Sequence, residues 1–148
     1  MTLRKLVVPL AILLCASATV AQRPPLRERA AQGDPEAQFT LAKNYEAGRG
    51  GLKKDYAEAQ RWYRLAAEQG DPFAQASLGL LYRFGKGVPQ DYLQAYMWFS
   101  LSMAQISGAD QDSIAELRGA AAAKMTAEQI EQADRMARQW RPRTAAQQ

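Results

Sequence analysis

The chain has 148 residues, of which 47% are hydrophobic, 23% charged and 9% aromatic. This composition is typical of a globular protein, and the length fits one domain with a buried core, so fibrous and fully disordered chains are excluded. The formal net charge is +4, the sequence has no histidine, and its single cysteine is Cys15.

The first 21 residues have the three parts of a secretory signal peptide. Arg4 and Lys5 precede an apolar run from Leu6 to Leu14, and small residues then lead to Ala21. The apolar run is too short to span a bilayer, so we expect cleavage after Ala21 rather than a membrane anchor. The remaining 127 residues carry a net charge of +2. We expect them in the periplasm or secreted, with no transmembrane segment.

Cleavage would remove Cys15, and with it the only thiol of the chain. The exported chain then has neither cysteine nor histidine. This excludes disulfides, thiolate redox sites, imidazole-bound zinc, and catalysis by Cys/His or Ser/His/Asp groups. A net charge of +2 also differs from the clustered positive charge of nucleic-acid-binding proteins. The sequence therefore predicts no catalytic site, no cofactor, no metal and no nucleic-acid partner.

Residues 33–69 and 70–108 are two copies of one unit. The copies align at a spacing of 37 residues and, past one extra glycine in the first copy, at 36. The matching pairs are Ala37/Ala74, Gln38/Gln75, Leu41/Leu78, Tyr45/Tyr82, Gly48/Gly85, Asp55/Asp91, Tyr56/Tyr92, Ala59/Ala95, Trp62/Trp98, Tyr63/Phe99 and Leu65/Leu101. This self-similarity indicates a repeat protein.

Each copy predicts two helices joined by a short loop. Asp34 and Asp71 are N-cap acceptors that stand before a proline, and apolar residues follow them at helical spacing. Gly48 and Gly85 then supply the left-handed residue at which a helix ends.

The second helix of each copy begins after Asp55 or Asp91. We expect each aspartate to form a capping box with the residue three positions on, Glu58 or Gln94. Small residues at the predicted helix crossings let the two backbones approach closely; these are Ala37, Ala59, Ala74, Gly79 and Ala95.

Helices are also expected at both ends of the repeats. Residues 22–32 form a lead-in with a capping helix from Leu26 to Gln32, which ends in AAQGD like the AAEQGD between the repeats. Residues 109–140 form a closing hairpin, giving six main helices with the two repeats. Such caps matter because short arrays are marginally stable without them.

The closing hairpin has its own capping signals. Asp110 is expected to cap an alanine-rich helix over about residues 111–124, and Thr126 with Gln129 forms a capping box for the last helix. The apolar stripe of that helix is Ile130, Ala133, Ala137 and Trp140. We expect residues 141–148 to be a disordered tail.

The second copy carries the motif Y..G.GV..DY..A..W in Tyr82, Gly85, Gly87, Val88, Asp91, Tyr92, Ala95 and Trp98. This motif resembles the Sel1-like repeat, a family related to the tetratricopeptide repeats. The first copy departs from the pattern, with GRGGLKK in its loop and Gly51 in place of Val88. The resemblance implies an all-α fold, a short α/α solenoid that binds proteins. The run MTAEQIEQADRMARQW also resembles the C-terminal extension of exported proteobacterial members.

Residues shared by the two copies are assigned to the fold. The carboxylates each stand before a helix, which favours capping, and no strand precedes the glycines as a phosphate-binding loop would require. The shared aromatic residues recur at inward-facing positions, which favours core packing over stacking on a ligand. The structural repeat residues are therefore Tyr45, Gly48, Asp55, Trp62, Tyr82, Gly85, Asp91 and Trp98.

Positions at which the copies differ are the candidates for partner binding. In solenoids that this chain resembles, the first helix of each repeat lines the concave face. On these helices an apolar stripe is flanked by polar residues, and the candidate set is Lys43, Asn44, Phe73, Leu80, Arg83 and Phe84. Packing of the three apolar residues against neighbouring repeats is the alternative.

Two further sets have simpler explanations. Tyr96 and Met97 are expected to pack against the closing hairpin. The basic tail is Arg135, Arg138, Arg141 and Arg143. A solvated helix end explains these arginines, because cations are favourable near the C-terminus of a helix; weak attraction to anionic lipid or acidic polysaccharide is the alternative.

The sequence thus predicts a non-catalytic periplasmic adaptor that binds another envelope protein or peptide. A sensor module that binds a glycan or a short peptide is the alternative. Some secreted relatives rich in cysteine have been described as β-lactamase-like, but this chain lacks their cysteines and has no Ser-x-x-Lys motif. A cell-wall enzyme is therefore the weaker interpretation.

Overall fold

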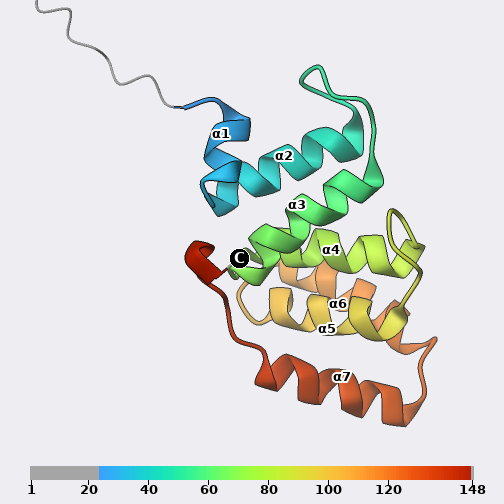
Figure 1. Ribbon diagram of the computed structural model, residues 1–148. Helices are drawn as coiled ribbons and strands as arrows, with labels where there is room; N and C mark the ends of the chain where they lie inside the picture. Colours follow the sequence, from blue (N-terminus) through green and yellow to red (C-terminus); the bar gives the residue numbers. More distant parts are fainter. Residues whose placement is uncertain (1–23, 148) are drawn as a thin grey trace, which may run out of the picture.

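A computed structural model describes residues 24–147, and the expected signal peptide lies outside this range. In chain order the elements are α1 (Leu26–Ala31), α2 (Pro35–Ala47), α3 (Tyr56–Glu68), α4 (Pro72–Phe84), α5 (Tyr92–Met103), α6 (Ala109–Ala122), α7 (Ala127–Gln139) and the 3-10 helix η1 (Ala145–Gln147). The pairs α2/α3 and α4/α5 stack in order, with α1 at one end and α6 and α7 at the other (Figure 1). The expected all-α solenoid is confirmed.

Local capping chemistry sets the boundaries of the first helix of each repeat. The side chains of Asp34 and Asp71 accept hydrogen bonds from backbone N–H groups of the first turn, at 3.1 and 2.7 Å. Gly48 and Gly85 end α2 and α4 with φ values of +66° and +65°. A side chain is strained in this left-handed region, which explains glycine at both positions.

The second helices begin with only half of the expected capping box. Asp55 and Asp91 do accept hydrogen bonds from first-turn N–H groups of α3 and α5. Their own N–H groups, however, donate to the carbonyl oxygens of Tyr45 and Tyr82, both at 2.9 Å. The sequence predicted that these N–H groups would donate to the side chains of Glu58 and Gln94, and this prediction is wrong. Each N–H donates instead to a carbonyl oxygen of the first helix of its repeat.

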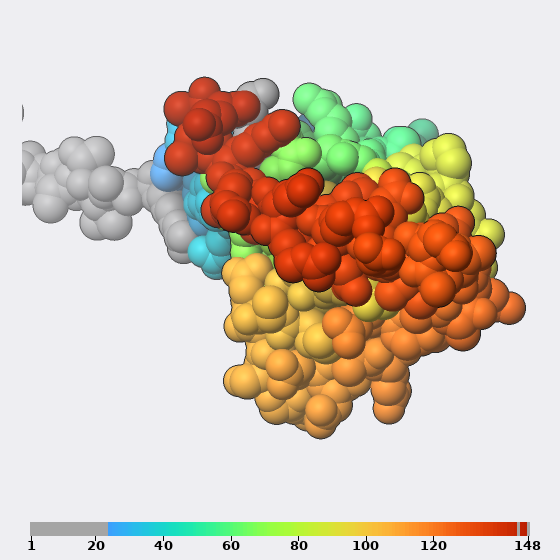
Figure 2. All heavy atoms as spheres, turned by 90° about the horizontal axis from the view of Figure 1, so that it is seen from below, coloured from blue at the N-terminus to red at the C-terminus, as the bar shows by residue number. Residues whose placement is uncertain are grey.

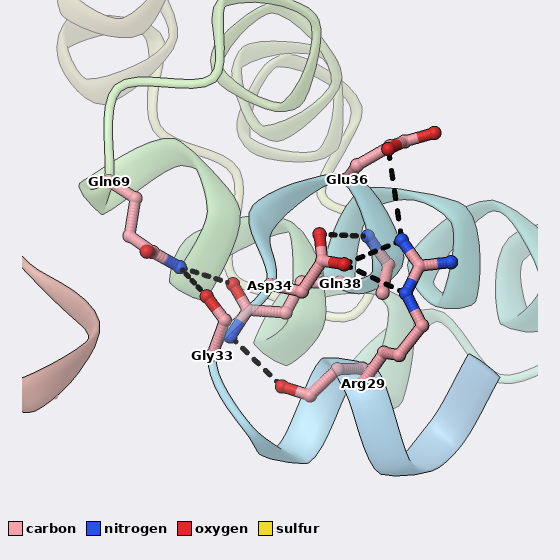
Figure 3. Close-up of polar contacts among 8 residues, drawn as sticks. Arg29, Gly33, Asp34, Glu36, Gln38 and Gln69 are labelled. Atoms are coloured by element: carbon pink, nitrogen blue, oxygen red, sulfur yellow. Dashed lines mark hydrogen bonds and ion pairs between the residues drawn. The ribbon is translucent and has the colours of Figure 1, made fainter. Parts of the chain in front are cut away.

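A buried glutamine joins α1, α2 and α3 (Figure 3). Gln38 is 2% exposed, and its amide nitrogen donates to the carbonyl oxygen of Ala30 at the end of α1, at 3.2 Å. Its amide oxygen accepts a hydrogen bond of 2.8 Å from Gln69, which also donates to the carbonyl oxygen of Gly33 at 2.9 Å. One side chain thus satisfies polar groups at the ends of two neighbouring helices.

The second repeat reproduces this arrangement. Gln75 is fully buried, donates to the carbonyl oxygen of Ala67 at the end of α3, and accepts a hydrogen bond of 3.0 Å from Gln105. Ala30 in α1 is thus the counterpart of Ala67 in α3. The short lead-in helix therefore accepts from the first repeat the same hydrogen bond that α3 accepts from the second.

The exposed end of the array adds an ion pair that the second repeat lacks. The Arg29 guanidinium donates two hydrogen bonds to one carboxylate oxygen of Asp34, at 2.8 and 2.5 Å (Figure 3). Burial raises the pKa of Asp34, but the hydrogen bond from Arg29, the backbone hydrogen bond from Ala37 and the charge of Arg29 together leave that pKa below its usual value. Burial raises the pKa of the equivalent Asp71.

The closing helices differ from expectation at one cap. Gly108, with φ of +73°, precedes α6, and no side chain caps that helix. Asp110 therefore lies within the first turn, so its assignment as the cap is wrong. The capping box of α7 is confirmed, since Thr126 N–H donates to the Gln129 side chain at 2.9 Å and Gln129 N–H donates to Thr126 Oγ1 at 3.2 Å.

The closing hairpin packs on α5, as expected for Tyr96. The side chains of Tyr96 and Met97 are both buried. The guanidinium of Arg118 on α6 lies 5.4 Å from the ring centroid of Tyr96. Burial, followed by the charge of Asp134 on α7, raises the pKa of the Tyr96 hydroxyl.

Residues after α7 contact the repeats, where a disordered tail was expected for residues 141–148. Figure 2 shows α7 and the segment after it lying across one face of the molecule. The ring of Trp140 packs edge-on against Trp98, with centroids 6.4 Å apart. The N–H of Arg143 donates to the carbonyl oxygen of Glu68 at 2.7 Å, and its guanidinium lies 3.4 Å from the Glu68 carboxylate. These contacts hold Trp140 against α5 and Arg143 against α3.

The surroundings of two mid-helix glycines predict opposite effects on stability when each is replaced by alanine. A Cβ added at Gly79 in α4 would lie 2.7 Å from the ring of the buried Phe99, whereas one at Gly119 in α6 would meet nothing within 4 Å. We expect Gly79→Ala to lower the free energy of unfolding by about 1–3 kcal/mol through overpacking. Gly119→Ala should raise it by up to about 1 kcal/mol, because alanine favours the helix.

Urea denaturation followed by circular dichroism measures both variants. Equal effects of the two substitutions would contradict the close crossing of α4 and α5.

Candidate protein-binding surface

A groove of about 350 Å³ runs between the first helices of the two repeats and the start of α6. We call it the α2/α4 groove. It is lined by Phe39, Lys43, Glu46, Tyr63, Phe73, Ala76, Ser77, Leu80, Asp110, Ser113 and Ile114. The first helices thus provide most of its walls, as the resemblance implied.

Three aromatic rings form the apolar part of the groove. The Phe39 ring centroid lies 5.8 Å from that of Tyr63 and 6.4 Å from that of Phe73. The Lys43 ammonium lies 5.4 Å from the Phe39 ring centroid. Phe73 remains 50% exposed, so packing against the neighbouring repeat covers only half of this side chain. An exposed aromatic ring in a groove, next to a second ring that carries a cation, is typical of the anchor positions of protein interfaces.

A buried hydroxyl and a carboxylate meet at one wall of the groove. The Tyr63 hydroxyl donates to Glu46 at 2.7 Å. Burial, and then the hydrogen bond to Glu46 and its negative charge, raise the pKa of Tyr63 well above its usual value. The hydroxyl therefore stays protonated, and its hydrogen bond fixes the position of the Glu46 carboxylate at the groove.

The predicted binding residues separate into three groups in the structure. Lys43, Phe73 and Leu80 line the α2/α4 groove. Asn44 lines an adjoining hollow of about 340 Å³, which shares three of its lining residues with the groove: Phe39, Lys43 and Glu46. Arg83 and Phe84 line neither.

Arg83 and Phe84 belong to a separate cluster at the far end of α4. The guanidinium of Arg83 lies 4.9 Å from the Phe84 ring centroid, and Lys86 reaches both this ring and that of Tyr56, at 5.7 and 5.3 Å. The loop after α4 approaches the first repeat directly here. A Cβ added at Gly87 would lie 2.3 Å from the Tyr56 carbonyl oxygen. Phe84 is 54% exposed.

Sequence reasoning missed several residues of the groove. Tyr63 was assigned to the core, and Asp110 to a helix cap. Asp110 and Ser113 come to the groove from α6, which follows the second repeat. No local signal connects them with α2, so only the packing of α6 reveals them. Ser77 carries no pattern of its own either.

Within residues 24–147, no group of three or more His, Cys, Asp or Glu side chains is placed to hold a metal ion. No helix in the same range is both long and apolar enough to cross a membrane.

The repeats match a known family. The family described as "Sel1 repeat" matches residues 35–71 and 72–105. The protein contains two Sel1 repeats. The structure divides the chain at nearly the same point, since α4 begins at Pro72.

Two solved structures share this arrangement of Sel1 repeats. One is the crystal structure of c5321, a protective antigen present in uropathogenic Escherichia coli strains that displays an SLR fold; it is 39% identical with a TM-score of 0.68 over 78% of this chain. The other is a Sel1 repeat protein from Oxalobacter formigenes, 28% identical with a TM-score of 0.56 over 72% of this chain. The matches cover 24% and 44% of those chains.

A curated relative is similar over a shorter stretch. The localization factor PodJL of Caulobacter vibrioides is 58% identical over 38 residues, which are 25% of this chain and 4% of PodJL. Sel1 repeats form scaffolds for protein–protein interaction, and the family is generally non-catalytic. The comparisons thus support a role in protein–protein interaction.

The Tyr63–Glu46 contact makes stability depend on pH. Unfolded tyrosine ionises near pH 10, and Tyr63 ionises higher in the fold. The contribution of Tyr63 to the free energy of unfolding is therefore complete below about pH 10. It is lost as the pH rises further, by about 1.4 kcal/mol per pH unit. At pH 8 we expect Tyr63→Phe to be less stable by about 1 kcal/mol through the lost hydrogen bond, and the gap should close by about pH 11.

Urea denaturation of both proteins at pH 8, 10 and 11 provides the measurement. A gap that stays constant over this range would contradict the shifted ionisation of Tyr63.

Proposed function

We propose that the protein is an adaptor whose α2/α4 groove docks a segment of another protein. The half-exposed ring of Phe73, whose centroid lies 6.4 Å from that of Phe39 in this groove, is the observation that carries the proposal. The Lys43 ammonium lies on the neighbouring Phe39 ring. The groove has room for one or two apolar side chains of a peptide, and Lys43 and Asp110 provide charge at its margin.

Rigidity is the basis of the mechanism. The groove is built on helices whose ends are fixed by buried hydrogen bonds, so the adaptor loses little conformational entropy when a segment binds. The affinity then comes from burial of the partner's apolar anchor beside Phe73.

A matched pair of phenylalanines tests the groove. Phe73 and Phe84 are exposed to a similar extent, 50% and 54%, but only Phe73 lies in the groove. We expect Phe73→Ser to weaken partner binding roughly tenfold or more, as for an anchor residue of an interface. Phe84→Ser should leave it unchanged, and both variants should keep the helical circular dichroism spectrum.

Photocrosslinking in cells that produce the protein natively identifies the partner. p-Benzoylphenylalanine placed at Phe73 should give a discrete adduct that Lys43→Glu suppresses, while the same group at the exposed Gln132 on α7 should not. An adduct from Gln132 alone would exclude the groove. Adducts of wall glycan instead of protein would favour a glycan sensor over an adaptor.

We further propose that the adaptor acts in the periplasm or after secretion. Support comes from residues 1–21, which have the charge and hydropathy pattern of a signal peptide. Intact mass spectrometry of the protein purified from a bacterial periplasm should give a chain that begins at Gln22. A full-length mass, or recovery in the cytoplasm alone, would contradict this location.

A further inference from the structure

The two repeats place their equivalent tryptophans in different surroundings. Trp98 in α5 is 4% exposed and lies beneath Trp140. Trp62 in α3 is only half-buried and faces a hollow of about 520 Å³. A residue that the repeat conserves between its two copies is thus covered in one and open in the other.

The chain's own C-terminal segment covers Trp98. Trp140 packs on the Trp98 ring, and a Cβ added at Gly70 would lie 3.7 Å from Pro142 and 3.9 Å from Trp140. Arg143 pairs with Glu68 next to them. Residues 140–143 thus occupy a place bounded by Glu68, Gly70 and Trp98.

The hollow at Trp62 is the same place in the first repeat. Ala31, Gly33 and Trp62 line it, and they are the repeat equivalents of Glu68, Gly70 and Trp98. The residues that line the hollow come from α1, the turn after it, α2 and α3. We call it the Trp62 hollow.

We propose that the Trp62 hollow is a second docking site, which takes a Trp-x-Pro segment with acidic flanks from a partner protein. The chain's own Trp140 and Pro142 show what the equivalent place accepts: an indole packed edge-on against the tryptophan of the repeat, followed by a proline against the glycine between helices. Aromatic side chains seated in this way are frequent anchors of interfaces.

The charges around the Trp62 hollow determine which charge is favoured on the residues that flank the docked tryptophan and proline. The carboxylate that pairs with Arg143 in the second repeat has no counterpart, because Ala31 replaces Glu68. Arg61 replaces Met97, and its guanidinium lies 5.4 Å from the Trp62 ring centroid. Glu58 lies 3.7 Å from Arg61 but also accepts a hydrogen bond from the Trp62 indole N–H. A basic residue that follows the docked tryptophan would thus lack the carboxylate that Glu68 provides in the second repeat. An acidic residue at that place could pair with Arg61.

The site is independent of the α2/α4 groove. The two share no lining residue. Loss of one activity therefore leaves the other measurable, and a failure of either proposal can be assigned to its own surface.

The three indole N–H groups of the chain, those of Trp62, Trp98 and Trp140, provide a direct readout by 1H–15N NMR. The probes are acetyl-Gln-Trp-Glu-Pro-Glu-amide and its basic counterpart, acetyl-Gln-Trp-Arg-Pro-Arg-amide. We expect the acidic peptide to shift the Trp62 signal and to bind about fivefold more tightly than the basic one. Trp62→Phe assigns the signal.

Arg61→Glu provides the decisive variant, because Arg61 is exposed and outside the core. It should reverse the preference between the two peptides, while Phe73→Ser should leave the titration unchanged. No shift of the Trp62 signal at about 1 mM peptide, which corresponds to a free energy of binding weaker than about 4 kcal/mol, would overturn the proposal.

Two other outcomes also overturn it. A shift of the Trp98 signal alone would mean that the peptide displaces the chain's own segment rather than entering the Trp62 hollow. A shift of the Trp62 signal with protein concentration and no peptide would assign the hollow to the C-terminal segment of a second copy.

Discussion

The hydrogen bonds of two buried glutamines, Gln38 and Gln75, hold the stack of helices together. The last carbonyl groups of a helix have no partner within that helix, and each glutamine satisfies one of them while accepting a bond from the end of another helix. A buried amide without its partners would cost about 1–3 kcal/mol. Each repeat therefore requires a preceding helix whose last turn presents a carbonyl oxygen to the buried glutamine. The six-residue α1 supplies this oxygen from Ala30.

This constraint also explains where specificity resides. The glutamines fix α2 against α3 and α4 against α5, so the first helices face the groove in a fixed register. The rings that meet across it, Phe39 and Phe73, stand at non-equivalent positions, where the other copy has Ala76 and Glu36. The conserved positions build the frame, and the positions at which the copies differ give the groove its chemistry.

What the sequence could predict was local or repeated. The caps at Asp34, Asp71 and Thr126 depend on neighbours within a few residues, and all three are present. Helical periodicity correctly places Phe73 and Leu80 on one stripe, but it cannot tell where α6 ends the groove, so Phe84 was assigned to it as well. The same lack of tertiary information concealed Asp110 and the contacts of Arg143 with Glu68.

Gly87, in the loop after α4, approaches the backbone of Tyr56, the first residue of α3, and so links the two repeats. Because backbone contacts backbone there, the loop after α4 limits how closely the second repeat can approach the first. The curvature of the solenoid thus depends partly on a residue outside both core and groove. We therefore expect a change in this loop alone to alter the superhelical pitch, with every helix and every lining residue unchanged.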